Sequence, residues 1–331
     1  MSSARESDRP VHSVKNVSSE AREASTSTEQ RVALELAELA TEQRNPLTVD
    51  MDDMSVIELL AVMNGEDQTV ATSVRKAIPQ IALAVERITV ALRAGGRLLY
   101  LGAGTSGRIG LLDAVECPPT FGTDPELVSV LLAGGAAAFI SAAEGAEDRP
   151  ENAICDLESA ELRQHDVVVG LAASGRTPYV IAGLDFAASV GAFTVSVACN
   201  RNAVVSRHAD IAIEVETGPE ILTGSTRLKA GTAQKLVCNM LSTAAMVQLG
   251  KTYQNLMIDM RPTNEKLLAR ARRIVAEAAG VTEEVAGIAL EQADNRCKIA
   301  TVMLLASVDP SEAERRLTAS NGFVARAVRY A

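Results

Sequence analysis

The sequence predicts an α/β fold: a doubly wound, parallel five-stranded sheet with flanking N-terminal helices and a small all-helical C-terminal domain. Five short apolar runs alternate with segments of helical period in the middle of the chain, as in βαβ units. Each run is almost continuously apolar, which is typical of parallel strands that are buried on both faces. Of the 331 residues, 47% are hydrophobic but only 3% are aromatic, which favours helices packed on a sheet over an all-β sandwich.

The N-terminal part is predicted to be an extension followed by helices. Residues 1–30 are rich in Ser, Glu and Arg and poor in apolar residues, which indicates a disordered extension. Residues 31–86 form a helical segment in which Ser55 caps one helix, and Pro79 kinks a later helix or divides it in two. The stretches of helical period in this segment are 31–40, 55–64 and 70–92.

Residues 87–250 carry the predicted sheet. Strands are expected at 97–104, 126–135, 166–174, 193–200 and 210–217. Helices are expected at 106–115, 136–144, 178–190 and 225–249. Ligands of such sheets bind at the carboxyl ends of the strands, near the point where the strand order reverses. Residues 262–331 show helical period with short polar breaks, which predicts the small helical domain.

Composition and charge exclude several classes of function. The formal net charge of −10 gives the chain no general attraction for nucleic acid or for an anionic membrane. Five widely spaced cysteines without a C-x-x-C pair indicate reduced thiols in a cytoplasmic protein. The three histidines have no partner at metal-ligand spacing, so no metal site is expected. Neither a signal peptide nor an apolar run of membrane-spanning length is evident.

Two glycine-rich loops of similar composition follow two of the predicted strands. The first contains "GAGTSGR" at 102–108, with glycines spaced as G-x-G-x-x-G, and the second contains "SGRTP" at 174–178. Backbone N–H groups, a serine hydroxyl and an arginine at a helix start make a cradle for phosphate. A dinucleotide site would also need an acidic residue at the end of the next strand, but that strand ends in Gly134 and Gly135. A third such loop is "TGSTR" at 223–227.

Longer motifs carry a resemblance to a known family. The two loops resemble the serine-bearing loops of sugar-isomerase (SIS) domains, which bind phosphosugars. The strings "TEQRNP", "GAGTSGRIGLLDAVECPPTFG", "EGAED", "AASGRTPYVIAGL" and "TGSTRLKAGTAQKLVCNML" together resemble the N-acetylmuramic acid 6-phosphate etherases. The resemblance runs from about residue 38 to the C-terminus. It implies cleavage of the D-lactyl ether of that phosphosugar, giving N-acetylglucosamine 6-phosphate and D-lactate, without a metal or organic cofactor. It also implies a cytoplasmic homodimer with sites near the subunit boundary.

Two glutamates are the candidate catalytic residues. An alkyl ether resists direct hydrolysis, but a base at C2 of the open-chain sugar and an acid at the ether oxygen allow elimination followed by water addition. Glu116 is expected just beyond a helix, where Pro118 and Pro119 stiffen the backbone. The residues alone favour a solvent-facing loop position for it over a catalytic one. In "EGAED" the sequence alone does not distinguish Glu144, Glu147 and Asp148 as the second catalytic acid. The resemblance selects Glu147 as the base and Glu116 as the proton donor, and we leave the order of these roles open.

The remaining candidates are substrate-binding residues. For the phosphate they are Gly104, Thr105, Ser106, Gly107, Ser174, Gly175 and Thr177. Arg108 and Arg176 are expected to touch the phosphate or the lactyl carboxylate, or to pair with surface acids. Other predicted ligand contacts are Glu220, Ser225, Thr226 and Lys229, of which Glu220 matches a helix-adjacent glutamate of SIS isomerases and Lys229 has a surface alternative. Cys117 lacks a base at suitable spacing and is expected to be a buried small residue.

Three alternatives to the etherase prediction remain. A sugar-phosphate aldose–ketose isomerase would share proton removal at C2 but would need no acid at a C3 ether. A non-catalytic phosphosugar sensor, similar to the glucokinase regulatory protein, would be expected to lack the paired glutamates. A transcription regulator with an SIS domain would carry a basic helix-turn-helix, which residues 1–30 do not resemble.

Overall fold

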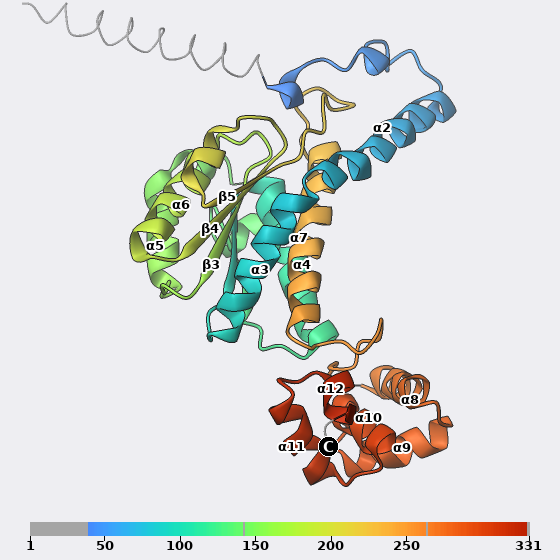
Figure 1. Cartoon of the computed structure of the whole chain (residues 1–331). Coiled ribbons are helices and arrows are strands. Elements are labelled where there is room, and N and C mark those ends of the chain that lie inside the picture. Colours follow the sequence, from blue (N-terminus) through green and yellow to red (C-terminus); the bar gives the residue numbers. More distant parts are fainter. Residues whose placement is uncertain (1–38, 142, 263, 330–331) are drawn as a thin grey trace, which may run out of the picture.

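A five-stranded, all-parallel sheet lies at the centre of the larger part of the molecule (Figure 1). The computed structural model describes residues 39–141, 143–262 and 264–329, so the predicted extension at 1–30 and nearly all of the helix predicted at 31–40 lie outside it. The sheet order is β2-β1-β3-β4-β5. The strands are β1 (Leu98–Gly102), β2 (Val128–Leu132), β3 (Val167–Leu171), β4 (Phe193–Ala198) and β5 (Ile211–Glu214). All five predicted strands are confirmed, each within its predicted range.

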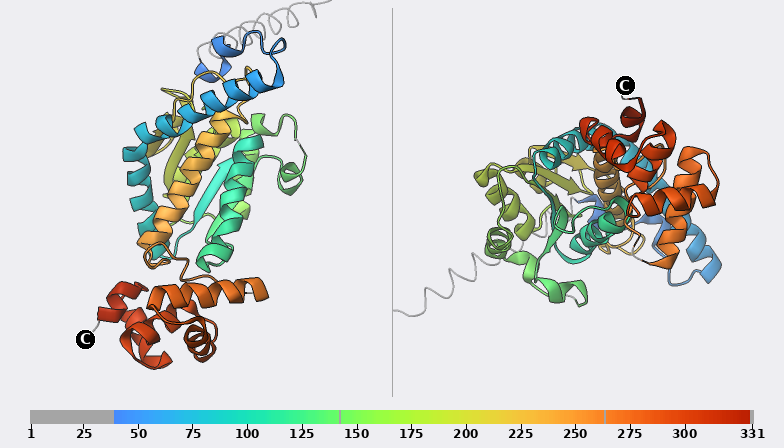
Figure 2. Two further views of the ribbon diagram at one scale, coloured as in Figure 1. Left: turned by 90° about the vertical axis from the view of Figure 1, so that its right-hand side faces the viewer. Right: turned by 90° about the horizontal axis from the view of Figure 1, so that it is seen from below.

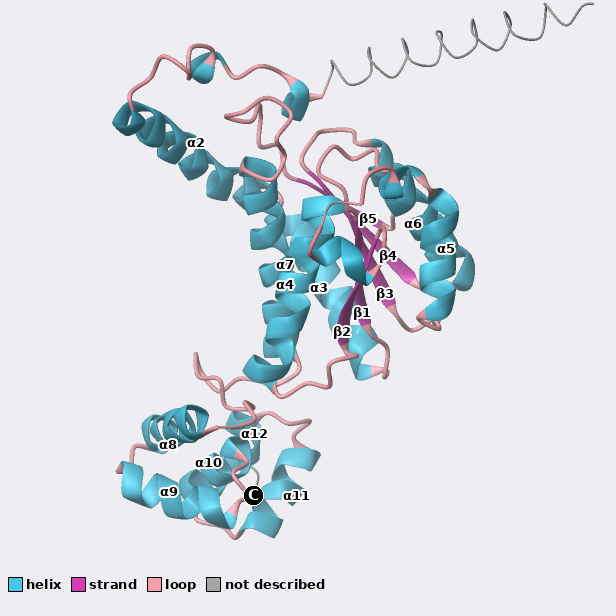
Figure 3. Ribbon diagram, turned by 180° about the vertical axis from the view of Figure 1, so that it is seen from behind, coloured by secondary structure: helices cyan, strands magenta, loops and turns pink. Residues whose placement is uncertain are grey.

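Helices cover both faces of the sheet (Figures 1 and 3). One face packs against α3 (Ile78–Arg93), α4 (Gly104–Phe121) and α7 (Lys229–Gln248), and α2 (Val56–Lys76) packs on α7. The other packs against α5 (Pro150–Ser159) and α6 (Pro178–Val190). Successive strand residues alternate between the two cores: Leu98 and Tyr100 enter the first, and Leu99 and Leu101 the second. Because both faces are buried, no polar alternation is visible in the strand sequences.

The helix predicted at 106–115 is longer than expected and contains the two prolines. It runs from Gly104 to Phe121 and ends at Gly122, whose φ of +62° and N–H bond of 2.9 Å to the Pro118 carbonyl close the last turn. A proline removes a helical hydrogen bond, but its fixed φ is itself helical. Cys117 and Phe121 are both buried in the core, so their burial holds this last turn in helical form.

The other helices differ from the prediction in one wrong assignment, one missed helix and one shifted start. Where a helix was expected at 136–144, the described residues contain only the 3-10 turn η3 (Ala136–Phe139), since Gly134 and Gly135 before it take positive φ values and no long apolar face follows. The helix α5 was not predicted, because its polar sequence contributes only two fully buried side chains. The helix expected from residue 225 begins at Lys229. The division at Pro79 is confirmed: α2 ends at Lys76, and Pro79 is the second residue of α3. The predicted segment boundary at residue 86 falls inside α3.

The C-terminal residues form a helical domain with its own core, as predicted (Figure 2). Its helices are α8 (Glu265–Ala279), α9 (Glu283–Gln292), α10 (Cys297–Ala306), α11 (Pro310–Ala319) and α12 (Val324–Arg329). It lies beyond the ends of α4 and α7 that point away from the carboxyl ends of the strands (Figures 1 and 2). Among the described residues, no helix is both long enough and apolar enough to cross a membrane.

A buried ion pair closes the amino edge of the sheet, where β1 and β3 begin. The Asp166 carboxylate lies 2.7 Å from the Arg97 guanidinium and also accepts the backbone N–H groups of Arg97 and Arg163. Burial alone would raise the pKa of Asp166, but these hydrogen bonds and the Arg97 charge outweigh burial and hold the pKa below its usual value. The pair ties together the starts of two adjacent strands.

Candidate functional site

The two serine-bearing loops lie side by side at the carboxyl edge of the sheet. Gly102 at the end of β1 is paired with Leu171 at the end of β3, so the loops that follow begin at the same level. The chain passes from β1 outward to β2 and then returns to β3 on the other side of β1, which makes this the point where the strand order reverses. Doubly wound sheets bind their ligands in the crevice at such a point.

The first loop is fixed against the start of α7. Ser106 is buried, and its hydroxyl lies 2.8 Å from the Gln234 side-chain oxygen. The Gln234 amide nitrogen is also buried and has no hydrogen-bond partner among the described residues. A buried amide donor without a partner is costly, and a ligand oxygen in the crevice would satisfy it. Sequence reasoning missed Gln234, although it lies in the quoted string "AGTAQK".

The second loop needs a glycine and is held by an asparagine. Gly175 has φ of +78°, and a Cβ there would overlap the Ala203 side chain, so no other residue fits. The Ser174 hydroxyl accepts the Arg176 N–H at 3.4 Å, and Arg176 and Thr177 are half-buried beside it. The Asn200 amide donates to the Ser174 carbonyl at 3.3 Å and to Thr41 at 3.0 Å. Thus the motif "TEQRNP" packs against this loop.

The start of α7 is built around a buried carboxylate and a buried ammonium group. Glu220 is fully buried and accepts the N–H groups of Lys229 and Ala230, each at 2.9 Å. Burial raises the pKa of Glu220 despite these bonds and the nearby Lys229 charge. Lys229 is 3% exposed and lies 2.6 Å from Glu66 of α2, so it is not a surface lysine. Ser225 and Thr226 are half-buried just before this turn.

A small cavity beside the first loop contains the predicted base. Its volume is about 220 Å³, and Gly104, Arg108, Glu144 and Glu147 contribute to its lining. Glu147 is exposed on the 3-10 turn η4 (Ala146–Asp148). Arg108 donates to the Ala138 carbonyl at 2.8 Å and to the Phe139 and Ser141 carbonyls at 3.3 Å, so its guanidinium holds the loop that leads to Glu147. Arg108 therefore orders the cavity wall, and no acid among the described residues pairs with it.

Glu116 lies at the other end of α4 from the first loop. Twelve residues separate it from Gly104, which is about 18 Å along a helix. The expectation that Glu116 follows the helix and lies beside the phosphate loop is therefore wrong for a single chain, because the helix continues for five more residues. Glu116 is exposed, as are Leu112, Val115 and Pro119, and this spacing places all four on one stripe of α4.

Cys117, next to Glu116, is confirmed as a buried structural residue. Its thiol is directed to the Asp113 carbonyl at 3.4 Å, and burial raises its pKa to about 12. Asp113 is buried too and accepts bonds from Tyr100, Asn239 and Ser242 at 2.7 to 3.0 Å. This polar cluster joins α4 to α7, and no sequence motif predicted it.

Taken together, the carboxyl edge carries hydroxyl, backbone and amide donors from two neighbouring loops and from α7, and the Glu147 carboxylate lines the cavity beside the first loop. Such a set can bind a phosphate ester and remove a proton from a carbon nearby. Residues 80–188 match the N-terminal SIS domain of the glucokinase regulatory protein, and residues 135–244 match the SIS domain.

Longer matches extend over most of the chain. It is 61% identical over 295 residues to an N-acetylmuramic acid 6-phosphate etherase of Mycolicibacterium smegmatis, covering 89% of this chain and 99% of that protein. It is 56% identical over 293 residues to a protein of the same name from Exiguobacterium, covering 88% and 100%. Among solved structures, a phosphoheptose isomerase from Francisella tularensis is 15% identical with a TM-score of 0.47, covering 59% of this chain and all of that one.

Proposed function

The chain belongs to the N-acetylmuramic acid 6-phosphate etherase family, and from this premise we propose how its residues perform the reaction. The enzyme cleaves the ether between the D-lactyl group and C3 of N-acetylmuramic acid 6-phosphate, in the recycling of cell-wall amino sugars. Its products are N-acetylglucosamine 6-phosphate and D-lactate. The observation that carries our assignment is that the two serine-bearing loops begin at the same level of the sheet, and that the cavity lined by Glu147 adjoins the first of them.

The phosphate binds between the two loops. The donors are the hydroxyls of Thr105, Ser174 and Thr177 and the backbone N–H groups of Thr105 and Ser106. The N–H groups of Gly107 and Gly175 already donate to the Ala103 and Ala172 carbonyls, so these two glycines shape the loops. The unpartnered Gln234 amide supplies a further buried donor. Gly104, Arg108 and Arg176 support these loops, while Glu220, Ser225, Thr226 and Lys229 form the wall on the α7 side. With no excess of positive side chains, the phosphate is held mainly by aligned amides and hydroxyls.

Glu147 removes the C2 proton of the open-chain sugar. It lies at the rim of the first loop, where the far end of a sugar anchored by its phosphate would come. The electron pair left at C2 forms the C2–C3 double bond and expels the ether oxygen, which needs a proton as it leaves. Water then adds at C3, and C2 is reprotonated. The sequence of steps predicts that a reaction run in D₂O places deuterium at C2 of the product.

Glu116 supplies the proton to the ether oxygen from a second copy of the chain. Within one chain it lies about 18 Å along α4 from Gly104, farther than a hexose phosphate extends. Its stripe of α4 exposes Leu112 and Val115, each about half, and the adjoining helix α7 exposes Met240 and Val247. A two-fold axis that packs these faces antiparallel would bury the apolar stripe and bring Glu116 of the partner subunit to each first loop. We therefore propose a homodimer with shared sites.

A mixed-dimer experiment tests this arrangement. Glu116→Gln and Glu147→Gln homodimers should each be nearly inactive in D-lactate release from N-acetylmuramic acid 6-phosphate. If the sites are shared, a heterodimer has one site with both glutamates and one with neither. Mixing equal amounts through unfolding and refolding should restore about a quarter of the wild-type activity. No recovery, with mixed dimers demonstrated by mass spectrometry, would place both glutamates in one chain's site.

We also propose that the enzyme works in the cytoplasm. All five cysteines are free thiols, and four of them are buried in the cores. Free thiols are typical of proteins from a reducing compartment. Fractionation of the producing cells, with D-lactate release as the assay, tests the location.

A further inference from the structure

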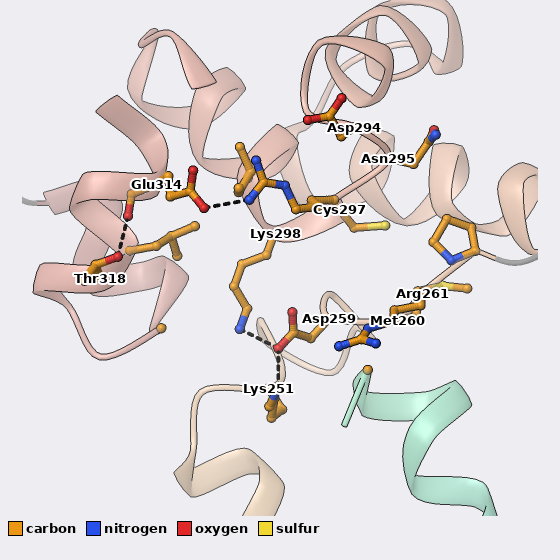
Figure 4. Close-up of a pocket in the computed structure, with 16 residues that line it drawn as sticks. Lys251, Asp259, Met260, Arg261, Asp294, Asn295, Cys297, Lys298, Glu314 and Thr318 are labelled. Carbon is orange, nitrogen blue, oxygen red and sulfur yellow. Dashed lines mark hydrogen bonds and ion pairs between the residues drawn. The ribbon is translucent and has the colours of Figure 1, made fainter. Parts of the chain in front are cut away.

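A large cavity lies away from the phosphate loops. It measures about 660 Å³ and lies between the end of α4, the segment 251–262 and the helices α10 and α11 (Figure 4). We refer to it as the junction cavity. Pockets of this size hold metabolites in many enzymes. The reaction as described so far gives it no role.

Four cationic side chains and three carboxylates line the junction cavity: Lys251, Arg261, Arg296 and Lys298, against Asp259, Asp294 and Glu314. Lys251 and Lys298 both direct their ammonium groups to one carboxylate, that of Asp259, at 3.0 and 2.7 Å (Figure 4). Lys298 is only 13% exposed, and burial lowers its pKa although Asp259 opposes this shift. The single Asp259 carboxylate thus pairs with two ammonium groups, so Lys251, Lys298 and Asp259 together carry a net charge of +1. Arg296 is matched by Glu314 at 2.6 Å and adds nothing to the excess.

A further cation, Arg261, is fixed at the end of α4. The loop that carries it packs on Gly122 so closely that a Cβ there would overlap the Asp259 carbonyl oxygen and touch the Arg261 side chain. The Arg261 guanidinium is 69% exposed and lies 3.8 Å from Asp124, which is 84% exposed. Such an exposed pair contributes little and exchanges readily for another anion. Arg261 is therefore available to a ligand at this place.

The same end of α4 carries Glu116. Six residues, about 9 Å of helix, separate Glu116 from Gly122. Gly122 also follows Val115 by seven residues, so the exposed stripe that includes Glu116 leads to the loop of Arg261. An extended arginine side chain spans most of that distance. Whatever substrate atom Glu116 reaches, groups attached to that atom come close to Arg261.

The substrate has one such group that is charged. The ether oxygen that Glu116 protonates is bonded to the lactyl carbon, and the next carbon is a carboxylate. We propose that Arg261 binds this lactyl carboxylate at the mouth of the junction cavity, with the Lys251 and Lys298 charges behind it. The inference rests on the proposed function, and it makes the helical C-terminal domain part of the recognition of substrate. An arginine fork is the group best shaped to bind a carboxylate.

The test compares Arg261→Gln with Arg273→Gln, an exposed arginine on α8 that does not line the cavity. For N-acetylmuramic acid 6-phosphate, KM of the Arg261 variant should rise about 10- to 100-fold, as expected for a lost charge-assisted hydrogen bond. Its inhibition constant for N-acetylglucosamine 6-phosphate, which lacks the lactyl group, should stay within twofold of wild type. D-lactate should inhibit wild type and Arg273→Gln but not Arg261→Gln.

Three results would overturn the inference. An unchanged KM in Arg261→Gln does so directly, and equal weakening of substrate and N-acetylglucosamine 6-phosphate would mean a general loss of structure. Lys251→Gln is a second variant, which should raise KM by a smaller factor in the same substrate-selective way; weakening of both ligands there also counts against us. A wild-type enzyme that releases no D-lactate overturns the proposed function itself, a result that the Arg261 comparison cannot produce.

Discussion

The two edges of the sheet hold buried acids in opposite electrostatic states. At the amino edge, hydrogen bonds and the Arg97 charge overcome burial and lower the pKa of Asp166. At the carboxyl edge, burial prevails and raises the pKa of Glu220, although two backbone N–H groups bind it. The nearest cation, Lys229, is shared with Glu66. At the amino edge the Asp166 charge is fully paired, which stabilises the fold. At the carboxyl edge the Gln234 amide has no partner among the described residues and the Glu220 charge is only partly balanced, as is typical of a ligand site.

The largest expected effect is at the carboxyl edge, where one substitution should lower activity without changing stability. Glu147→Gln should lower kcat/KM for D-lactate release about 10²- to 10⁴-fold, since it removes a general base. The free energy of unfolding should stay unchanged because Glu147 is exposed. Glu144→Gln, which alters the same cavity, is the matched control and should keep most of the activity. An equal loss in both variants would show that cavity charge, not a specific base, matters.

The opposite separation is expected at the amino edge. Asp166→Asn should lower the free energy of unfolding by about 3 kcal/mol, because the Arg97 guanidinium then stays partly buried without a counter-ion. The kcat of the folded protein should remain near wild type, since this edge is a full strand length from the crevice. Urea denaturation at pH 7 measures the first quantity. A large loss of kcat with little loss of stability would refute the division between the edges.

An intermediate effect is expected at the boundary between α2 and the site. Glu66→Gln removes the carboxylate that lies 2.6 Å from the buried Lys229 ammonium group and should cost about 2 kcal/mol of unfolding free energy. Because Lys229 caps the wall of the crevice, KM should rise as well. Glu58→Gln, in the exposed first turn of α2, is the control for changes to this helix. A normal KM in the Glu66 variant would show that α2 does not contribute to substrate binding.

The two acids are expected to change the free energy of unfolding in opposite directions as pH changes. Asp166 has a lowered folded pKa, so its stabilisation is present above its unfolded pKa near 3.8 and is lost as pH falls further. Glu220 has a raised folded pKa, so the folded state binds the extra proton and stability falls as pH rises above 4.5. Each slope is at most about 1.4 kcal/mol per pH unit. Urea denaturation between pH 3 and 7 should show Asp166→Asn losing the first slope and Glu220→Gln the second.

The sequence was sufficient for the sheet and the loops, because parallel strands and glycine turns have local signatures. The five apolar runs and the glycines of the two loops marked them without any tertiary information. The end of α4 could not be predicted in this way: two prolines indicate a stop, but the burial of Cys117 and Phe121 in the core keeps the last turn helical. Gln234 and Glu66 were missed because their partners lie more than 120 positions away.

Those long separations also fix when the site can exist during synthesis. The bonds that order it join Ser106 to Gln234, Glu66 to Lys229 and Thr41 to Asn200, which are 128, 163 and 159 positions apart. A ribosome releases the residues from the N-terminus onward, so the sheet strands can pair while the α7 half of the crevice is still unmade. A nascent chain shorter than about 230 residues therefore has the two serine loops but lacks the Gln234 contact to the first loop and most of the start of α7. The proposed phosphosugar site is therefore completed only after more than two thirds of the chain has been synthesised.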